Sequence, residues 1–176
     1  GGKTWRTSEP FPAFGTGEAT LAELSDGRIY YNSRRHWAPQ GANPLRRWTA
    51  WSVDGGATWK GLEICEVLPD GPQDTNYGCM GGLVRLPVLG RDILVYSNCD
   101  SPKGRHHGTV WASFDGGKTW SEEITIAKPG FQSGGLTVDE KNGDIIAFAE
   151  AHHPPAPVNV FRSADQGKTW KAQETV

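Results

Sequence analysis

Two arginines and one glutamate carry the side chains best suited to chemistry in this sequence. Arg34 closes the segment 30–34, and Arg105 follows a similar segment at 96–98. Two guanidinium groups directed at one point form a bidentate clamp for a carboxylate. Glu18, sixteen residues before Arg34, could act beside them as a base or orient a nucleophile. The alternative is ordinary solvated charge at strand ends, and the residues alone favour neither interpretation.

Composition excludes several classes of protein. Lys plus Arg is 18 and Asp plus Glu is 20, a formal charge of −2, which disfavours a protein that tracks nucleic-acid phosphates. No apolar run approaches the roughly 20 residues that span a bilayer. The 23 Gly and 12 Pro favour short strands joined by tight turns over a helical bundle. We therefore expect an all-β protein with no nucleic-acid partner and no membrane span.

Cysteine and histidine give no sign of a metal site. Cys65, Cys79 and Cys99 form no CxxC pair and are expected to be small buried hydrophobes. The histidine pairs at 106–107 and 152–153 have no third ligand at a metal-binding spacing. We expect no metal and no cofactor.

An eight-residue repeat organises the chain. The pattern S-x-D-x-G-x-T-W occurs at 52–59, 113–120 and 163–170, and residues 2–5 match its last four positions. The four tryptophans are 50 to 61 residues apart, which is the period of propeller blades or solenoid units. In such a turn the Asp caps backbone N–H groups and the Gly adopts a positive φ. The repeat matches the Asp box of sialidases and other β-propeller proteins, and its role is structural.

Alternating apolar residues between these boxes predict four strands per repeat. The expected strands are 19–24, 28–34, 48–53 and 59–67; then 82–87, 92–98, 109–114 and 120–127; then 135–138, 144–150, 158–163 and 170–176. They form about three four-stranded antiparallel blades of a β-propeller, at approximately 18–67, 80–127 and 133–176, with 1–9 ending a preceding blade. Three blades do not close a ring, so we expect 1–176 to be a partial propeller domain from a longer protein.

Chain direction sorts the loops onto two faces. Strands alternate in direction within a blade, so the Asp boxes share one face with the turns between first and second strands. The starts of first strands and the loops between second and third strands share the other face, around the channel mouth. Glu18, Arg34 and Arg105 are therefore predicted to converge at this mouth, where function is expected.

These mouth residues resemble the exo-α-sialidase (neuraminidase) family. The resemblance covers essentially the whole chain and is carried by Glu18, the L-x-x-G turn at 24–27, the N-x-R triplet at 32–34, and the segment from Ser97 to Arg105 before an Asp box. It implies a six-bladed propeller with an arginine triad on the sialic acid carboxylate, a Tyr nucleophile activated by a Glu, and an Asp acid/base. Glu18 resembles the Glu that pairs with the nucleophile, and Arg34 and Arg105 resemble the second and third triad members. Glu150 resembles the Glu that supports the triad.

The sequence departs from that family at the nucleophile. The expected Tyr position reads Ser133, with Gln132 beside it, and a Ser hydroxyl is shorter and less acidic than a phenol. Tyr77 could reach the mouth from the neighbouring blade and serve instead, or it could be an ordinary loop aromatic. The family's Asp and first Arg are expected before residue 1.

Two functions of different classes follow. The first is a sialidase-like glycoside hydrolase that cleaves terminal α-linked sialic acid, or a related acidic sugar, from glycans, with Glu18 and Tyr77 as catalytic residues. Arg34, Arg105, Glu150, Gln132 and Ser133 are its expected substrate-binding residues. The alternative is a non-catalytic or altered-specificity propeller that binds acidic glycans, with a purely structural propeller third. Sialylated or other acidic glycans are the expected partners, and the resemblance favours a secreted or periplasmic protein.

Overall fold

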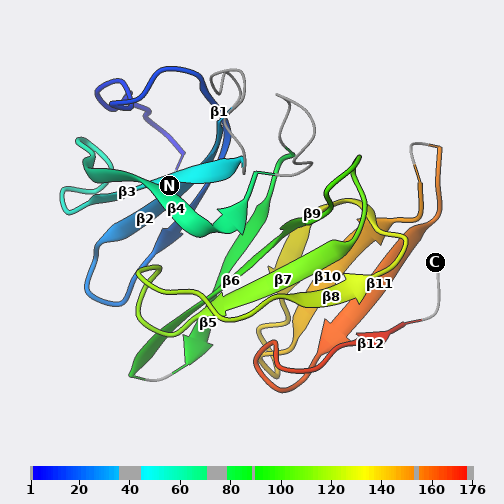
Figure 1. Ribbon diagram of the computed structural model, residues 1–176. Coiled ribbons are helices and arrows are strands. Elements are labelled where there is room, and N and C mark those ends of the chain that lie inside the picture. The colour runs from blue at the N-terminus through cyan, green and yellow to red at the C-terminus, as the bar shows by residue number, and fades with distance from the viewer. Residues whose placement is uncertain (1, 36–44, 71–78, 89, 153–154, 174–176) are drawn as a thin grey trace.

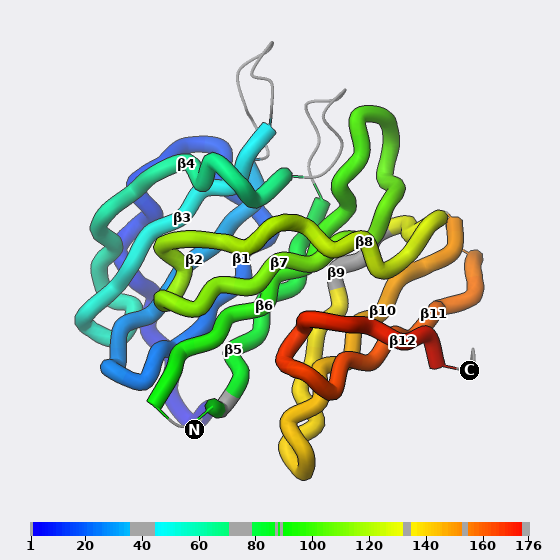
Figure 2. Tube along the Cα trace, turned by 60° about the horizontal axis from the view of Figure 1, so that its bottom comes forward, coloured from blue at the N-terminus to red at the C-terminus, as the bar shows by residue number. Residues whose placement is uncertain are grey.

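Three four-stranded antiparallel sheets make up the part of the chain that the structure describes (Figure 1). The computed structural model describes residues 2–35, 45–70, 79–88, 90–152 and 155–173, with the backbone alone at 87 and 132–134. Within these ranges there are twelve strands and no helix. The strand order in each sheet follows the chain, as the repeat predicts, and the second sheet lies between the first and third (Figures 1 and 2).

The strand bounds agree with the sequence prediction in most places. The first sheet contains β1 (Thr16–Glu23), β2 (Ile29–Arg35), β3 (Arg46–Ser52) and β4 (Lys60–Pro69). The second contains β5 (Gly82–Val88), β6 (Arg91–Cys99), β7 (Gly108–Ser113) and β8 (Ile124–Ala127). The third contains β9 (Phe131–Val138), β10 (Ile145–Glu150), β11 (Val158–Ser163) and β12 (Lys171–Ala172).

One boundary differs for a visible reason. The strand predicted at 120–127 begins at Ile124. Before it, the Ser121 hydroxyl takes the place of a main-chain acceptor in the hydrogen bonding with β7. The Ala112 N–H donates to Ser121 Oγ at 3.0 Å, while the Ser121 N–H donates to the Ala112 carbonyl at 2.8 Å. Trp120 turns inward and packs against Tyr30 of the first sheet. The predicted strand end at 174–176 lies outside the described residues.

The three Asp boxes fold into the same hydrogen-bonded turn. In each, the Thr hydroxyl donates to one carboxylate oxygen of the Asp at 2.6 Å. The Ser hydroxyl donates to the other oxygen at 2.7–2.9 Å and accepts the N–H of the second Gly position. Bonding to the charged form lowers the pKa of the three carboxyl groups, Asp54, Asp115 and Asp165. These bonds fix the turns between third and fourth strands, at the opposite end of each sheet from the loops between second and third strands.

Apolar side chains fill both seams between sheets. Between the second and third sheets, the fully buried Ile93, Val95 and Ile145 pack with Trp170. Between the first and second, Leu24 and Tyr30 pack with Leu94 and Trp120. The first strands of the three sheets contact one another in order, β1 with β5 and β5 with β9. This places the starts of β1, β5 and β9 close together at one end of the molecule.

The region before the first sheet contains no strand between residues 2 and 15. Its contacts are with the first sheet: the Glu9 N–H donates to the Ala57 carbonyl at 3.1 Å, and Phe11 stacks on Tyr31 with ring centroids 4.1 Å apart. In the part of the chain that the structure describes, no helix is long and apolar enough to cross a membrane.

Candidate functional site

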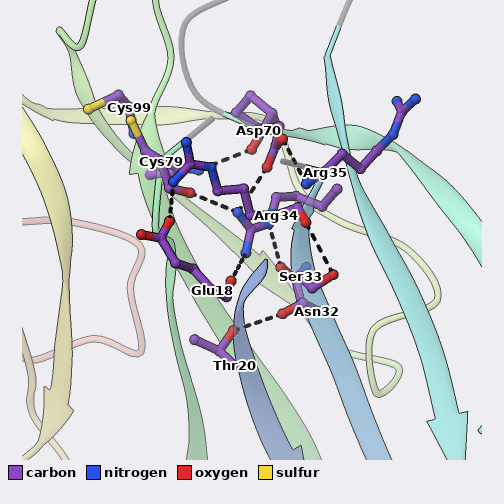
Figure 3. Close-up of polar contacts among 12 residues, drawn as sticks. Glu18, Thr20, Asn32, Ser33, Arg34, Arg35, Asp70, Cys79 and Cys99 are labelled. Carbon is purple, nitrogen blue, oxygen red and sulfur yellow. Dashed lines mark hydrogen bonds and ion pairs between the residues drawn. The ribbon is translucent and has the colours of Figure 1, made fainter. Parts of the chain in front are cut away.

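Glu18 and Arg34 meet at the end of the first sheet opposite its Asp box. Thr16, the first residue of β1, pairs with Arg35, the last residue of β2. Glu18 and Arg34 therefore lie on neighbouring strands at the same end of the sheet. The Arg34 Nη1 donates to Glu18 Oε2 at 2.6 Å (Figure 3). The Arg34 side chain is 8% exposed and that of Glu18 is 44% exposed. The ion pair therefore has a buried cation and a carboxylate open to solvent.

Arg34 retains unused hydrogen-bonding capacity. Its Nε is buried and has no hydrogen-bond partner among the described residues. A guanidinium presents donors in a planar fork, and one donor left unpaired in a buried position costs free energy. The ion pair with Glu18 therefore does not exhaust the donors of Arg34.

Arg105 adds its positive charge to the same region. It lies in the loop between β6 and β7, half-buried. The pKa of the Cys79 thiol is raised by its hydrogen bond with the Cys99 thiol and by burial, and the charges of Arg105 and Arg34 both act in the opposite direction. The convergence of Arg105 with Glu18 and Arg34 stays a prediction.

A second ion pair lies beneath the first, and sequence reasoning did not assign it a role. Arg47 at the start of β3 and Asp70 after β4 are both fully buried, with Arg47 Nη1 donating to Asp70 Oδ1 at 3.0 Å. Burial raises the pKa of Asp70 to about 6, although the charge of Arg47 and the Arg35 N–H favour the ionised form. Arg and Asp are seldom fully buried, so nothing in the sequence distinguishes these two from surface charges.

The third sheet contributes Glu150 at the end of β10. Its Oε2 is buried and has no hydrogen-bond partner in the described part of the chain. Glu150 pairs with Phe131 on β9, and the backbone of Gln132 and Ser133 follows directly after Phe131. The side chains of Gln132 and Ser133, and the whole of Tyr77, lie outside the described residues. The nucleophile alternatives raised by the sequence therefore stay predictions.

The described residues contain no cluster of three or more His, Cys, Asp or Glu side chains that could hold a metal ion. The chemistry available from the described side chains is that of two arginines, a solvent-accessible carboxylate and a buried carboxylate.

Three consecutive four-stranded sheets, each with an Asp-box turn between its third and fourth strands and with charged groups at the opposite end, define an Asp-box β-propeller architecture. The BNR/Asp-box repeat matches residues 107–122 and 161–172. A sialidase from Bacteroides fragilis is 34% identical over 128 residues, covering 70% of this chain and 21% of that protein. A sialidase from Micromonospora viridifaciens is 33% identical over 134 residues, covering 75% of this chain and 19% of that protein.

A solved structure supports the same conclusion. The NanB sialidase from Streptococcus pneumoniae superimposes with a TM-score of 0.65 at 25% identity, covering 86% of this chain and 23% of that one. The chain is thus an Asp-box repeat protein homologous to bacterial sialidases. It spans about a fifth of the length of the two curated relatives.

Proposed function

We propose that the protein is a sialidase-like glycoside hydrolase that cleaves a terminal, carboxylate-bearing sugar of the sialic acid class from glycans. The observation that carries the proposal is the Glu18–Arg34 pair at 2.6 Å, in which the cation is buried and has a spare donor. The charge of Arg105 in the same region and the homology to sialidases support it.

The arginines would bind the substrate carboxylate. Arg34 gives one Nη to Glu18 and its buried Nε is unpaired, so the existing ion pair leaves part of the guanidinium's donor capacity unused. Arg105 would supply the second guanidinium. Charge-assisted hydrogen bonds to a carboxylate are about twice as strong as neutral ones and select against uncharged sugars.

Glu18 would act at the reacting centre. A retaining glycosidase passes through an oxocarbenium-like transition state, and sialidases are the known case in which Tyr replaces a carboxylate nucleophile. An anionic nucleophile would be repelled by the carboxylate of the substrate. In this scheme Glu18 takes the proton of the nucleophile, for which Tyr77 is the candidate in this chain. Glu150, Gln132 and Ser133 would line the sugar site from the third sheet.

The test is turnover of a fluorogenic sialoside by the full-length protein and three variants. Glu18→Gln and Arg105→Ala are each expected to lower kcat/KM by about 10- to 100-fold, since a charge-assisted hydrogen bond contributes about 1.5–3 kcal/mol. Arg162→Ala is the control, because this arginine binds Asp139 and Asp144 in the third sheet. Unchanged rates in both site variants would refute the roles. Binding of sialosides without turnover would instead support the glycan-binding alternative.

A further inference from the structure

Arg47 is fully buried and its guanidinium donates to several acceptors, and the proposed catalysis leaves it without a role. Its Nε donates to Asn32 Oδ1 at 2.7 Å. Its Nη1 donates to Asp70 Oδ1 at 3.0 Å and to the Cys79 carbonyl at 2.8 Å, and its Nη2 donates to the Glu18 carbonyl at 3.3 Å. The guanidinium also lies over the ring of Tyr96, 5.6 Å from its centroid.

These contacts hold both members of the outer ion pair. On one side, Arg47 binds the main chain of Glu18 directly. On the other, Asp70 Oδ2 accepts the N–H of Arg35, the residue after Arg34, at 2.9 Å (Figure 3). The inner pair of Arg47 and Asp70 therefore fixes the backbone on which each outer side chain stands.

The inner pair also connects the two sheets that supply the arginines. Cys79 precedes β5, and its N–H donates to the Asp70 carbonyl at 2.8 Å while its own carbonyl binds Arg47. One buried guanidinium thus contacts the start of β1 and the segment leading into β5, both of which border the proposed sugar site.

Stability alone is a poor explanation for this pair. Removing two charges from water costs several kcal/mol per ion, and replacing a buried ion pair by apolar residues is often neutral or stabilising. A lysine is a point charge and cannot supply the planar fork that reaches four acceptors. What the guanidinium provides is a fixed relative position for groups from four segments of chain, which is what preorganised binding requires.

We propose that Arg47 and Asp70 are positioning residues that set the geometry of Glu18 and Arg34 for a substrate carboxylate. This inference rests on the proposed function and extends it to residues that do not touch the sugar. Their loss is expected to weaken the selection for a carboxylate more than it weakens the fold.

The experiment measures that selection as a ratio of affinities, using the full-length protein. The methyl ester of N-acetylneuraminic acid replaces the carboxylate by a neutral group that is one methyl larger, so the ratio of the two Kd values, compared between wild type and variant, reports the alignment of Arg34. Arg47→Lys is expected to reduce the ratio by about 10-fold or more, because misplacement by about 1 Å costs up to 100-fold. Ile145→Val is the stability control, since Ile145 is fully buried in the seam between the second and third sheets. A ratio unchanged in Arg47→Lys, or lowered equally in Ile145→Val, would overturn the proposal.

A second measurement separates this proposal from the proposed function. The side-chain ¹⁵N signals of Arg34 report rotation and exchange of its guanidinium without any ligand. In Arg47→Lys and Asp70→Asn these signals are expected to exchange faster, while Ile145→Val leaves them unchanged. If the wild type shows no preference for the acid but Arg34 loses order in both variants, the proposed substrate is wrong and the positioning role stands. If Arg34 is unaffected, the positioning role is wrong whatever the substrate. Should Arg47→Lys fail to fold, Asp70→Asn, which keeps the size of the side chain, carries both measurements.

Discussion

A methyl group added at Gly117 should be more damaging than the same change at the equivalent position of either other Asp box. Gly56, Gly117 and Gly167 occupy the same place in the three turns, with φ of +85°, +93° and +88°. A Cβ in this left-handed region costs about 1–2 kcal/mol. Replacement by alanine should therefore destabilise all three turns by this amount from backbone strain alone.

The surrounding space distinguishes the three sites. A Cβ at Gly117 would lie 2.6 Å from Cε2 of Tyr30, whereas the nearest atoms at Gly56 and Gly167 are 3.7 and 3.6 Å away. Tyr30 is fully buried, with the rings of Trp51 and Trp120 5.5 and 6.1 Å from its own, so it has no room to withdraw. Overpacking of this kind costs about 1–3 kcal/mol further.

Gly117→Ala is therefore expected to lose about 2–5 kcal/mol of unfolding free energy, against about 1–2 kcal/mol for Gly56→Ala and Gly167→Ala. Urea unfolding followed by tryptophan fluorescence measures each loss as a shift of the midpoint at constant m. The two other glycines serve as controls, because they have the same strain without the overlap. Equal losses at all three positions would show that the second Asp box does not pack on Tyr30 as described.

Three further changes test other contacts. Hydrogen bonds from Thr169 and Ser163 lower the pKa of Asp165 from 3.8 to about 2, so its carboxylate stabilises the fold above pH 4 and ceases to do so as the pH falls toward 2. The Tm difference between wild type and Asp165→Asn should accordingly close over that range, and a constant difference would contradict the assignment. Tyr96→Phe removes a buried hydroxyl that accepts from Asn98 at 2.7 Å and donates to the Pro69 carbonyl at 3.3 Å. We expect a loss of about 1–2 kcal/mol in urea unfolding, and no loss would mean that the hydroxyl contributes nothing. Ser121→Ala deprives the Ala112 N–H of its acceptor, so the hydrogen exchange of that amide should accelerate with a loss of about 1 kcal/mol, and unchanged exchange would argue against the bond.

The turns and the strand order were predictable because their causes are local. The S-x-D-x-G-x-T-W pattern specifies its own hydrogen bonds within eight residues, and each copy folds as expected. Strand alternation then follows from chain direction, which is enough to bring Glu18 and Arg34 to one end of the first sheet. The Glu18 carboxylate forms an ion pair with Arg34, a contact that the sequence prediction did not include.

The inner ion pair could not be predicted in the same way. Arg47 and Asp70 are 23 residues apart and belong to residue types that are usually solvated, so neither periodicity nor spacing marks them as buried. Their burial depends on how Asn32, Cys79 and Tyr96 close around them, which involves contacts between two sheets. The late start of β8 likewise involves a contact between two sheets. Trp120 packs beside Tyr30 of the first sheet and is not part of the strand.

Because every hydrogen-bonded strand pair joins consecutive strands, the backbone pairing in each sheet links residues that are near one another along the chain. The paired residues are nevertheless a strand and a turn or loop apart, as Thr16 and Arg35 are, so each sheet must close its own connections before its strands can pair. A nascent chain can complete the first sheet while the second is still being synthesised, and each finished sheet offers a template on which the next one condenses. Synthesis at the ribosome would then complete the three described sheets in chain order.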